Sequence, residues 1–310
     1  EKYIETIVAH ELETPISLIA PPLCRARLYA LSHERYVLMF IIHHIVTDGF
    51  SMAMLFRELS TTYTALLQGK DNPLPPLPYN YATLCQEQNQ PHQSMKHLTS
   101  LKFWREHLLN APPLWSLPTD FPRRSTIRYK GAMKQHRLSP AHSKILIQRA
   151  KEANVSLFCY LFAFYQFFLH RYTQQDIIVV GTPIQQRDNQ KTQQLFGFMV
   201  NTLPVAMDFS ENLKYDVYVQ QMHQQLIQVY KHQDIYFDEI IEHIKPPRSS
   251  EHDPLFQTAF ALQTSSHAEL SLKGCLCESL HHKAIEQQRM SRTEVYFVAE
   301  LEDGILTFIF

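Results

Sequence analysis

Glycine is scarce in this chain, with 7 glycines among 310 residues, and neither G-x-G-x-x-G nor G-x-x-x-x-G-K occurs. Loops that cradle nucleotide phosphates need glycine, because the backbone must approach the phosphate closely. The sequence therefore argues against a dinucleotide-dependent dehydrogenase or a P-loop nucleotide hydrolase. We expect the few glycines to mark tight places in the backbone, especially Gly49, Gly181 and Gly197.

Excess charge and long apolar runs are lacking as well. The 29 basic and 30 acidic residues leave a formal net charge of −1, whereas nucleic-acid binders carry a concentrated basic excess. The longest apolar run, residues 155–169, is interrupted by Ser156 and Gln166 and is shorter than the roughly 20 residues that span a bilayer. We interpret it as a buried helix and expect neither a nucleic acid nor a membrane as partner.

The five cysteines are an odd number and are scattered, which suits a reducing compartment such as the cytoplasm better than a disulfide framework. Cys275 and Cys277 lie near His281 and His282. A zinc site there would place four ligands in a very short loop. We favour ordinary thiols on a surface hairpin and predict no metal.

Helical and strand patterns alternate along the chain, which predicts an α/β fold. An apolar run at residues 35–42 predicts a buried strand, and Ser51 is the expected cap of a helix that ends near Gly69. Ser156 is expected to cap the long apolar helix, and Gly181 to end the strand after it. Further predicted strands lie at residues 203–207, 255–263, 293–301 and 306–310, with helices near 101–109 and 219–229. Proline-rich connectors at residues 71–78 and 111–128 favour two lobes, 1–95 and 96–310.

One group of residues is dense enough to carry chemistry: His43, His44, Asp48, Gly49 and Ser51, between the first strand and its helix. Adjacent strand residues point to opposite faces, so one histidine is expected to be structural and the other free for proton transfer. Imidazole suits that task because its unperturbed pKa is about 6.5. Two structural histidines, a metal site that includes Asp48, or a simple Asp48 helix cap are the alternatives; adjacent strand residues rarely converge on one ion.

This group resembles the HHxxxDGxS motif of condensation domains in nonribosomal peptide synthetases, at all five fixed positions. Other stretches resemble the same family in the same order. They are residues 13–31, 104–132, 180–183 with Arg187 (GxP…R), 197–203 (GFFVNTL), 232–238 (HQD…) and 248–263. The similarity therefore covers nearly the whole chain.

Several positions depart from the family pattern. Thr83 stands where aspartate is usual, Tyr236 where proline is usual and Glu251 where serine is usual, and residues 291–297 fit loosely. An early motif with paired arginine and histidine and the last helix are missing. We therefore expect the domain to be incomplete at both ends.

The resemblance implies two chloramphenicol-acetyltransferase-like lobes in a V-shaped pseudodimer, with mixed sheets flanked by helices. It implies His44 as the catalytic residue and Asp48 paired with Arg187. His43, Asp48, Gly49 and Arg187 would be structural at the active site. Ser51, Asn201 and Gln233 are candidate tunnel or motif residues.

The implied activity is acyltransfer: amide formation between a donor acyl or peptidyl thioester and an acceptor aminoacyl thioester. Both would arrive on the phosphopantetheine arms of peptidyl carrier proteins, beside adenylation and carrier domains, with no permanently bound cofactor. The 232–238 and 248–263 segments resemble domains that take an L-configured donor. The alternatives are a stand-alone coenzyme A or carrier-dependent O/N-acyltransferase, an epimerisation domain, and a non-catalytic recruitment module of the same fold.

Overall fold

The computed structural model of the chain describes residues 2–77, 79–88, 94–114, 117–122, 131–264, 270–280 and 293–310. The chain divides into two compact units, each built from separate stretches of sequence. Unit 1 comprises residues 1–90, 186–200 and 266–288, and unit 2 comprises residues 91–185, 201–265 and 289–310. The sequence predicted two contiguous lobes, whereas two segments from beyond residue 96 belong to unit 1.

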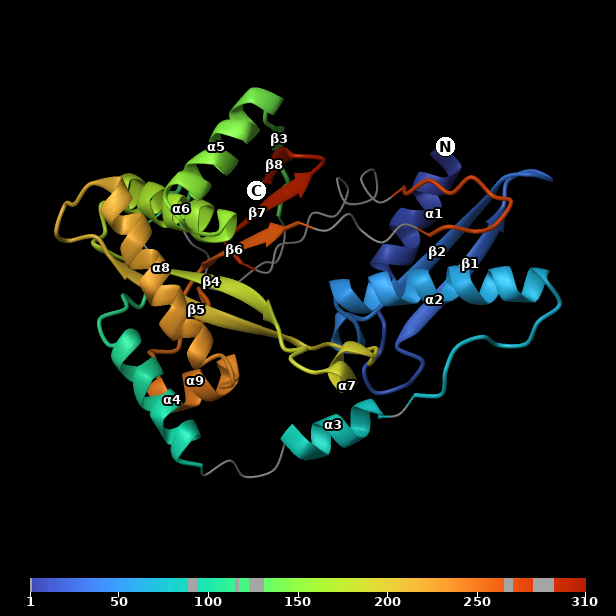
Figure 1. Cartoon of the computed structure of the whole chain (residues 1–310), viewed down its shortest axis with the longest axis horizontal. Coiled ribbons are helices and arrows are strands. Elements are labelled where there is room, and N and C mark those ends of the chain that lie inside the picture. The colour runs from blue at the N-terminus through green and yellow to red at the C-terminus, as the bar shows by residue number, and fades with distance from the viewer. Residues whose placement is uncertain are drawn as a thin grey trace. The chain divides into compact units, whose positions relative to one another are not determined.

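Unit 1 contains an antiparallel hairpin followed by a long helix (Figure 1). Strand β1 (Cys24–Ala30) pairs with β2 (Tyr36–Ile42), so that Cys24 lies opposite Ile42. The chain then forms the 3-10 turn η1 (His44–Val46) and helix α2 (Gly49–Leu67). The other helices of unit 1 are α1 (Lys2–Glu13), α3 (Tyr81–Gln88) and α7 (Gln190–Gln193).

Helix α2 begins three residues earlier than predicted. Asp48 is the N-cap, with extended backbone (φ −134°), and its carboxylate accepts a hydrogen bond from Ser51 N–H. The prediction of Ser51 as the cap was therefore wrong: Asp48 caps helices about as well as serine, lies three positions upstream, and places Ser51 within the first turn. Helix α2 ends at Leu67, and Gly69 (φ +68°) follows in the left-handed conformation that glycine adopts readily.

Unit 2 is built around a six-stranded mixed sheet in the order β3-β8-β7-β6-β4-β5. Neighbours β4, β6 and β7 are parallel, and β8 is antiparallel to both β7 and β3. The strands are β3 (Gln135–Arg137), β4 (Ile177–Gln185), β5 (Val200–Asp208), β6 (Thr258–Gln263), β7 (Val295–Glu302) and β8 (Ile305–Ile309). The helices are α4 (Met95–His107), α5 (Pro140–Glu152), α6 (Leu157–Thr173), α8 (Tyr215–Lys231) and α9 (Phe237–Ile244). The predicted α/β class is confirmed.

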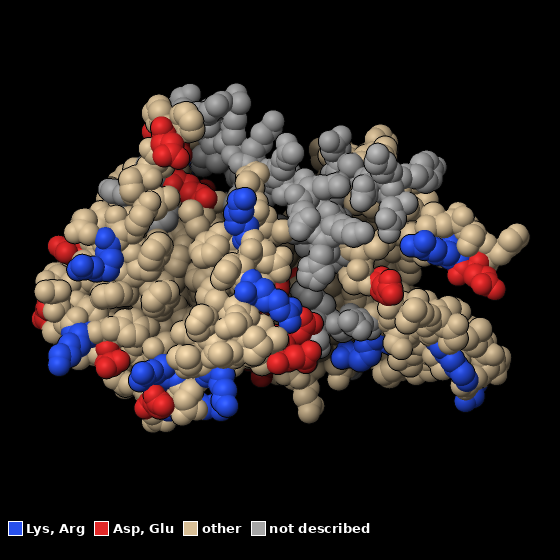
Figure 2. Space-filling model, turned by 90° about the horizontal axis from the view of Figure 1, so that it is seen from above, with Lys and Arg blue, Asp and Glu red and all other residues tan. Residues whose placement is uncertain are grey.

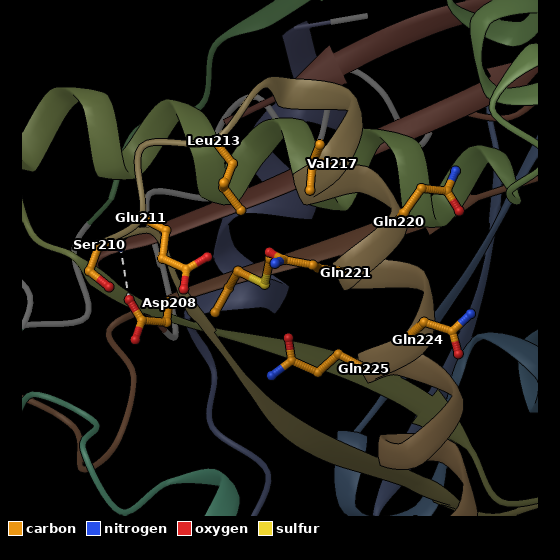
Figure 3. Close-up of a pocket in the computed structure, with 10 residues that line it drawn as sticks. Asp208, Ser210, Glu211, Leu213, Val217, Gln220, Gln221, Gln224 and Gln225 are labelled. Atoms are coloured by element: carbon orange, nitrogen blue, oxygen red, sulfur yellow. Dashed lines mark hydrogen bonds between the residues drawn. The ribbon is translucent and has the colours of Figure 1, made fainter.

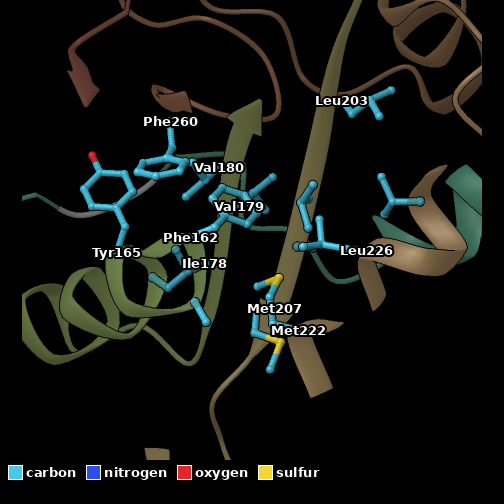
Figure 4. Close-up of a cluster of buried hydrophobic side chains, with 14 of the residues drawn as sticks. Phe162, Tyr165, Ile178, Val179, Val180, Leu203, Met207, Met222, Leu226 and Phe260 are labelled. Atoms are coloured by element: carbon cyan, nitrogen blue, oxygen red, sulfur yellow. The ribbon is translucent and has the colours of Figure 1, made fainter. Parts of the chain in front are cut away.

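The core of unit 2 lies between this sheet and helices α6 and α8 (Figure 4). Ser156 caps α6 as predicted, because its hydroxyl accepts a hydrogen bond from Cys159 N–H. The predicted burial of the apolar run holds for one face of α6 only: seven of its 17 residues are buried, whereas Phe164 and Phe168 are exposed. Each large side chain buried there contributes about 1.5–3 kcal/mol. Fully enclosed members include Phe162, Leu203, Met222, Val229 and Phe260.

Among the described residues, no single helix is long and apolar enough to cross a membrane. Helices α5 and α6 satisfy the length and composition only as a pair, with a bend of 102° between them.

The strand β4 runs on past the predicted stop at Gly181 and ends at Gln185. A Cβ on Gly181 would lie 2.6 Å from Cζ of Phe256. The glycine therefore permits close packing of an aromatic ring on a continuing strand, rather than a turn.

Basic and acidic side chains are interspersed over a largely uncharged surface on the face shown in Figure 2. That distribution agrees with the nearly balanced charge of the sequence.

Candidate active site

The two motif histidines follow strand β2, which ends at Ile42. His43 is the N-cap of η1, and its Nδ1 accepts a hydrogen bond from Ile45 N–H at 3.1 Å. His44 is the first residue of that turn. His43 and His44 therefore differ because one caps the turn and the other begins it. The prediction that they point to opposite faces of a strand was wrong, because neither histidine lies in β2.

His44 is exposed, yet its ring is held by a short hydrogen bond. Nδ1 lies 2.6 Å from the carbonyl oxygen of Thr47. Because a carbonyl can only accept, Nδ1 must carry the proton in this contact. In the neutral ring, Nε2 then keeps a lone pair that can accept a proton. The His44 ring also meets the Phe198 ring edge-on, with 5.3 Å between centroids and an interplanar angle of 87°.

Asp48 follows this turn and is almost completely buried. Its carboxylate accepts hydrogen bonds from Ser51 N–H at 2.8 Å and from Met199 N–H at 3.0 Å. Arg187 Nη2 lies 3.1 and 3.0 Å from the two carboxylate oxygens. Burial alone raises the pKa of Asp48, but the hydrogen bonds from Ser51, Met199 and Arg187 outweigh it and hold the pKa below its ordinary value.

Arg187 forms the pair with Asp48 that the resemblance implies, and it is also buried. Its Nη1 donates to the carbonyls of Thr192 at 2.8 Å and Leu195 at 2.7 Å. Its guanidinium carbon lies 4.5 Å from the centre of the Phe50 ring. One guanidinium thereby joins the start of α2 to the segment 192–197.

Ser51 is fully buried within the same network. Its hydroxyl donates to Gly197 C=O at 2.8 Å and accepts from Gly197 N–H at 3.0 Å and from Arg187 Nη2 at 2.9 Å. Every hydrogen-bonding position of the hydroxyl is satisfied. Ser51 therefore connects helix α2 to residue 197 and does not line an open space.

Gly49 and Gly197 differ in how much space surrounds them. A Cβ on Gly49 would meet nothing within 4 Å, so the expectation of a tight backbone there was wrong. A Cβ on Gly197 would lie 2.5 Å from Cδ2 of Tyr81. Gly49 leaves open space at the exposed start of α2, whereas Gly197 permits a close aromatic contact.

Asn201 and Gln233 belong to unit 2, whereas the residues described above belong to unit 1. Asn201 Nδ2 donates to the carbonyls of Gln233 at 3.3 Å and Ile235 at 2.8 Å, and Asn201 Oδ1 accepts from Phe237 N–H at 3.1 Å. The buried Asn201 amide therefore fixes the chain between α8 and α9 to strand β5.

Helix α4 packs on the same loop through His232. The backbone carbonyl of His232 accepts a hydrogen bond from Trp104 Nε1 at 2.9 Å. The Nδ1 atom of the His232 ring lies 2.9 Å from Ser100 Oγ. This ring stacks on Phe103 with 4.3 Å between centroids. Burial is the main cause that lowers the pKa of His232.

Two departures from the family pattern have local explanations. Thr83 donates through its N–H and its hydroxyl to Asn80 Oδ1, at 2.8 and 3.0 Å, at the start of α3. Tyr236 is the N-cap of α9 with φ −72°, a value that proline would also adopt.

Three contacts of the site, made by Thr47, Phe198 and Tyr81, were not predicted from the sequence. The Thr47 carbonyl could not be chosen by residue type, since every residue has one. Phe198 and Tyr81 belong to stretches that resemble the family, but only three-dimensional contact shows that both meet the histidine turn or its supporting segment.

Cys275 and Cys277 are free thiols in a segment that lies along α2. Cys275 Sγ lies 3.9 Å from Tyr63 Oη, and Ser271 N–H donates to Ser60 Oγ at 3.1 Å. His281 and His282 lie outside the described residues. Within the described ranges, no three His, Cys, Asp or Glu side chains form a group that could hold a metal ion.

A pocket of about 590 Å³ lies in unit 2, between the end of β5 and helix α8 (Figure 3). Polar side chains line much of it, including Asp208, Glu211, Gln221 and Gln224. It contains none of the predicted site residues. The candidate site is therefore the histidine turn of unit 1.

The chain shares sequence with known proteins. One linear gramicidin synthase protein of Brevibacillus parabrevis is 35% identical over 263 residues, which cover 85% of this chain and 5% of that protein. A second linear gramicidin synthase protein of the same organism is 31% identical over 307 residues, which cover 99% of this chain and 4% of that protein. The chain thus spans about a twentieth of the length of these relatives.

Solved structures share the fold. A four-domain nonribosomal peptide synthetase, holo-AB3403, superposes with a TM-score of 0.82 at 24% identity, over 99% of this chain and 24% of that one. The X-domain from teicoplanin biosynthesis superposes with a TM-score of 0.85 at 19% identity, over 100% of this chain and 71% of that one. The sequence profile of the Condensation domain family matches residues 1–295. The predicted resemblance is confirmed: the chain belongs to the condensation-domain family.

Proposed function

We propose that this chain forms amide bonds in nonribosomal peptide synthesis. The donor would be an acyl or peptidyl thioester and the acceptor an aminoacyl thioester, both carried on phosphopantetheine arms of peptidyl carrier proteins. Family membership and the synthases among its relatives support this proposal. The observation that carries it is the orientation of His44, whose Nδ1 is engaged by Thr47 C=O while the ring remains exposed.

The reaction needs one bond made, one bond broken and one proton moved. The acceptor amine attacks the thioester carbonyl, a C–N bond forms, the C–S bond breaks, and the proton lost by the amine balances the one gained by the leaving thiol. His44 Nε2 would accept the amine proton and orient the nitrogen. Since an α-amine has a pKa of about 7.7–8 and is partly neutral near pH 7.5, alignment should contribute more than base strength. Effective molarities of about 10⁵–10⁸ M exceed general-base factors of about 10²–10⁴.

The other motif residues would act through architecture. Asp48, Arg187 and Ser51 hold residue 197 against the start of α2. His43 closes the turn that presents His44. Gly49 would leave room for substrate beside that turn, because no side chain occupies the space. Partner carrier and adenylation domains, and a cytoplasmic setting, belong to the same proposal.

A transfer assay between two loaded carrier proteins tests the proposal. We expect His44→Ala in the full-length protein to lower the single-turnover rate by about 10²–10⁴-fold with an unchanged melting temperature. His33→Ala, in the exposed β1–β2 turn, is the matched control and should retain full activity. A folded His44→Ala variant with normal amide formation would contradict the assignment.

One alternative has a specific observation behind it. The X-domain, which shares the fold, has been solved in a complex with OxyB from teicoplanin biosynthesis. A recruitment module would bind a partner protein and show no transfer with any loaded carriers. Turnover of free coenzyme A thioesters would instead favour a stand-alone acyltransferase.

A further inference from the structure

Within unit 1, hydrogen bonds hold the segment from Leu195 to Met199 in place at alternate residues. Leu195 C=O accepts from Arg187 at 2.7 Å, and Gly197 exchanges two hydrogen bonds with Ser51 Oγ at 2.8 and 3.0 Å. Met199 N–H donates to Asp48 Oδ2 at 3.0 Å. Residues 195, 197 and 199 are all buried. The backbone on both sides of residue 198 is therefore held in place.

Helix α3 adds a further constraint on residue 198. Tyr81 Oη donates to the Phe198 carbonyl at 2.9 Å, and the Tyr81 ring packs on Gly197 where any larger residue would collide with it. Leu84 of the same helix forms a small buried cluster with Leu195 and Met199. Both peptide units beside Phe198 are thereby anchored to a packed helix.

The ring of Phe198 ends against His44, perpendicular to the imidazole at 5.3 Å between centroids. The hydrogen bond to Thr47 C=O fixes Nδ1, but one hydrogen bond still lets an exposed ring swing about that contact. An aromatic neighbour in an edge-on arrangement supplies a second point of contact and a preferred angle. Two contacts in different directions define the plane of the imidazole.

We propose that Phe198 is a positioning residue for His44: held by Tyr81 and the anchors at 197 and 199, its ring sets the imidazole plane and so the direction of Nε2. This inference rests on the proposed catalytic role of His44. Its effect on rate would arise from alignment, in which a displacement of about 1 Å can change a rate by about 10²-fold.

A double-mutant cycle in the full-length protein tests this. We expect Phe198→Leu to lower the single-turnover rate by about 10²-fold at saturating carrier concentrations, with carrier affinity and melting temperature unchanged. Phe198→Tyr keeps the ring and should restore most of the rate. Phe196→Leu is the matched control, because Phe196 lies two residues away with an exposed side chain, and it should have no effect.

The cycle separates positioning from a merely structural role. In a His44→Ala background, Phe198→Leu should change the residual rate by less than about twofold, because the group that it orients is gone. Additive losses in the double variant, or a fully active Phe198→Leu variant, would overturn the proposal.

A readout without catalysis makes the two proposals distinguishable. Diethyl pyrocarbonate acylates accessible imidazole nitrogens, and mass spectrometry gives the rate at His44 relative to His33. Phe198→Leu should raise the acylation rate of His44 relative to that of His33, and Phe196→Leu should leave this ratio unchanged. Equal ratios in the wild type and in Phe198→Leu would refute the contact. If His44→Ala stays active while labelling still depends on Phe198, the catalytic assignment fails and the contact stands.

Discussion

Replacing Asp48 by asparagine isolates the charge in the buried network. Asparagine caps helices about as well as aspartate, so the hydrogen bond from Ser51 N–H can survive the change. The amide, however, has one acceptor oxygen where the carboxylate has two. Its NH₂ group would face hydrogen-bond donors, Met199 N–H or Arg187 Nη2, one of which then loses its acceptor.

The size of the effect follows from burial. The side chains of Asp48 and Arg187 are 0% and 3% exposed, and their closest N···O distance is 3.0 Å. Removing one partner of such a pair leaves an uncompensated charge and destabilises by about 3–5 kcal/mol. At about 2–4 °C per kcal/mol for proteins of 150–250 residues, the melting temperature should fall by on the order of 10 °C.

Thermal and urea unfolding of four proteins measure this: wild type, Asp48→Asn, Arg187→Gln and the double variant. Both single changes should lower stability, and the double change should cost less than their sum, because no charge is then left unpaired. Arg149→Gln provides the control, since Arg149 and Glu152 form an exposed ion pair worth at most about 1 kcal/mol. Strict additivity of the Asp48 and Arg187 changes, or an unchanged melting temperature in Asp48→Asn, would refute the reasoning.

Further predictions concern pH, glycine and substrate. Burial lowers the pKa of His107 to about 4, although a hydrogen bond to the Pro204 backbone opposes the shift. Between pH 6.5 and 4 the unfolded chain therefore binds more protons than the folded chain. The free energy of unfolding should fall by about 3 kcal/mol as the pH drops through that window. Urea titrations of His107→Gln should show a flatter profile there, and an unchanged profile would contradict the argument. Calorimetry should show that Gly181→Ala destabilises the protein by about 1–3 kcal/mol, because the new Cβ overpacks on Phe256. The same measurement on Gly49→Ala should show unchanged or slightly higher stability, since no atom lies within 4 Å of the new Cβ. Carrier-bound L-donors should be used faster than their D-isomers in the transfer assay; a preference for D-donors would reject that subtype.

Local signals predicted much of the fold. The apolar stripes of α2 and α6 and the Ser156 cap depend on residues within one or two turns of each other, so sequence spacing was sufficient to find both helices, although the cap of α2 was misplaced. It was less reliable for glycine. Gly181 looked like a strand end, but its purpose depends on Phe256, which lies 75 positions further along the chain.

The site was predicted in a different way. The Asp48–Arg187 pair came from family resemblance, since nothing in the chemistry of two residues 139 positions apart brings them together. The contacts of Ser51 with Gly197, 146 positions away, were not predicted at all. Hydroxyls and backbone groups are too common in any sequence for their type to indicate a partner.

Phe196 and Phe198 show why contact, and not residue type, must decide such assignments. Both are phenylalanines in one short segment, and neither hydropathy nor spacing distinguishes them. The distinction comes from where the backbone is anchored. Phe198 is held against His44 by hydrogen bonds at residues 195, 197 and 199 and by the Tyr81 hydroxyl, which donates to the Phe198 carbonyl. The side chain of Phe196, in contrast, is 38% exposed. A rigid backbone on both sides makes a side chain able to orient a catalytic ring. The same anchors involve Asp48 and Ser51, so the motif that supplies the histidine also secures the segment that would orient it.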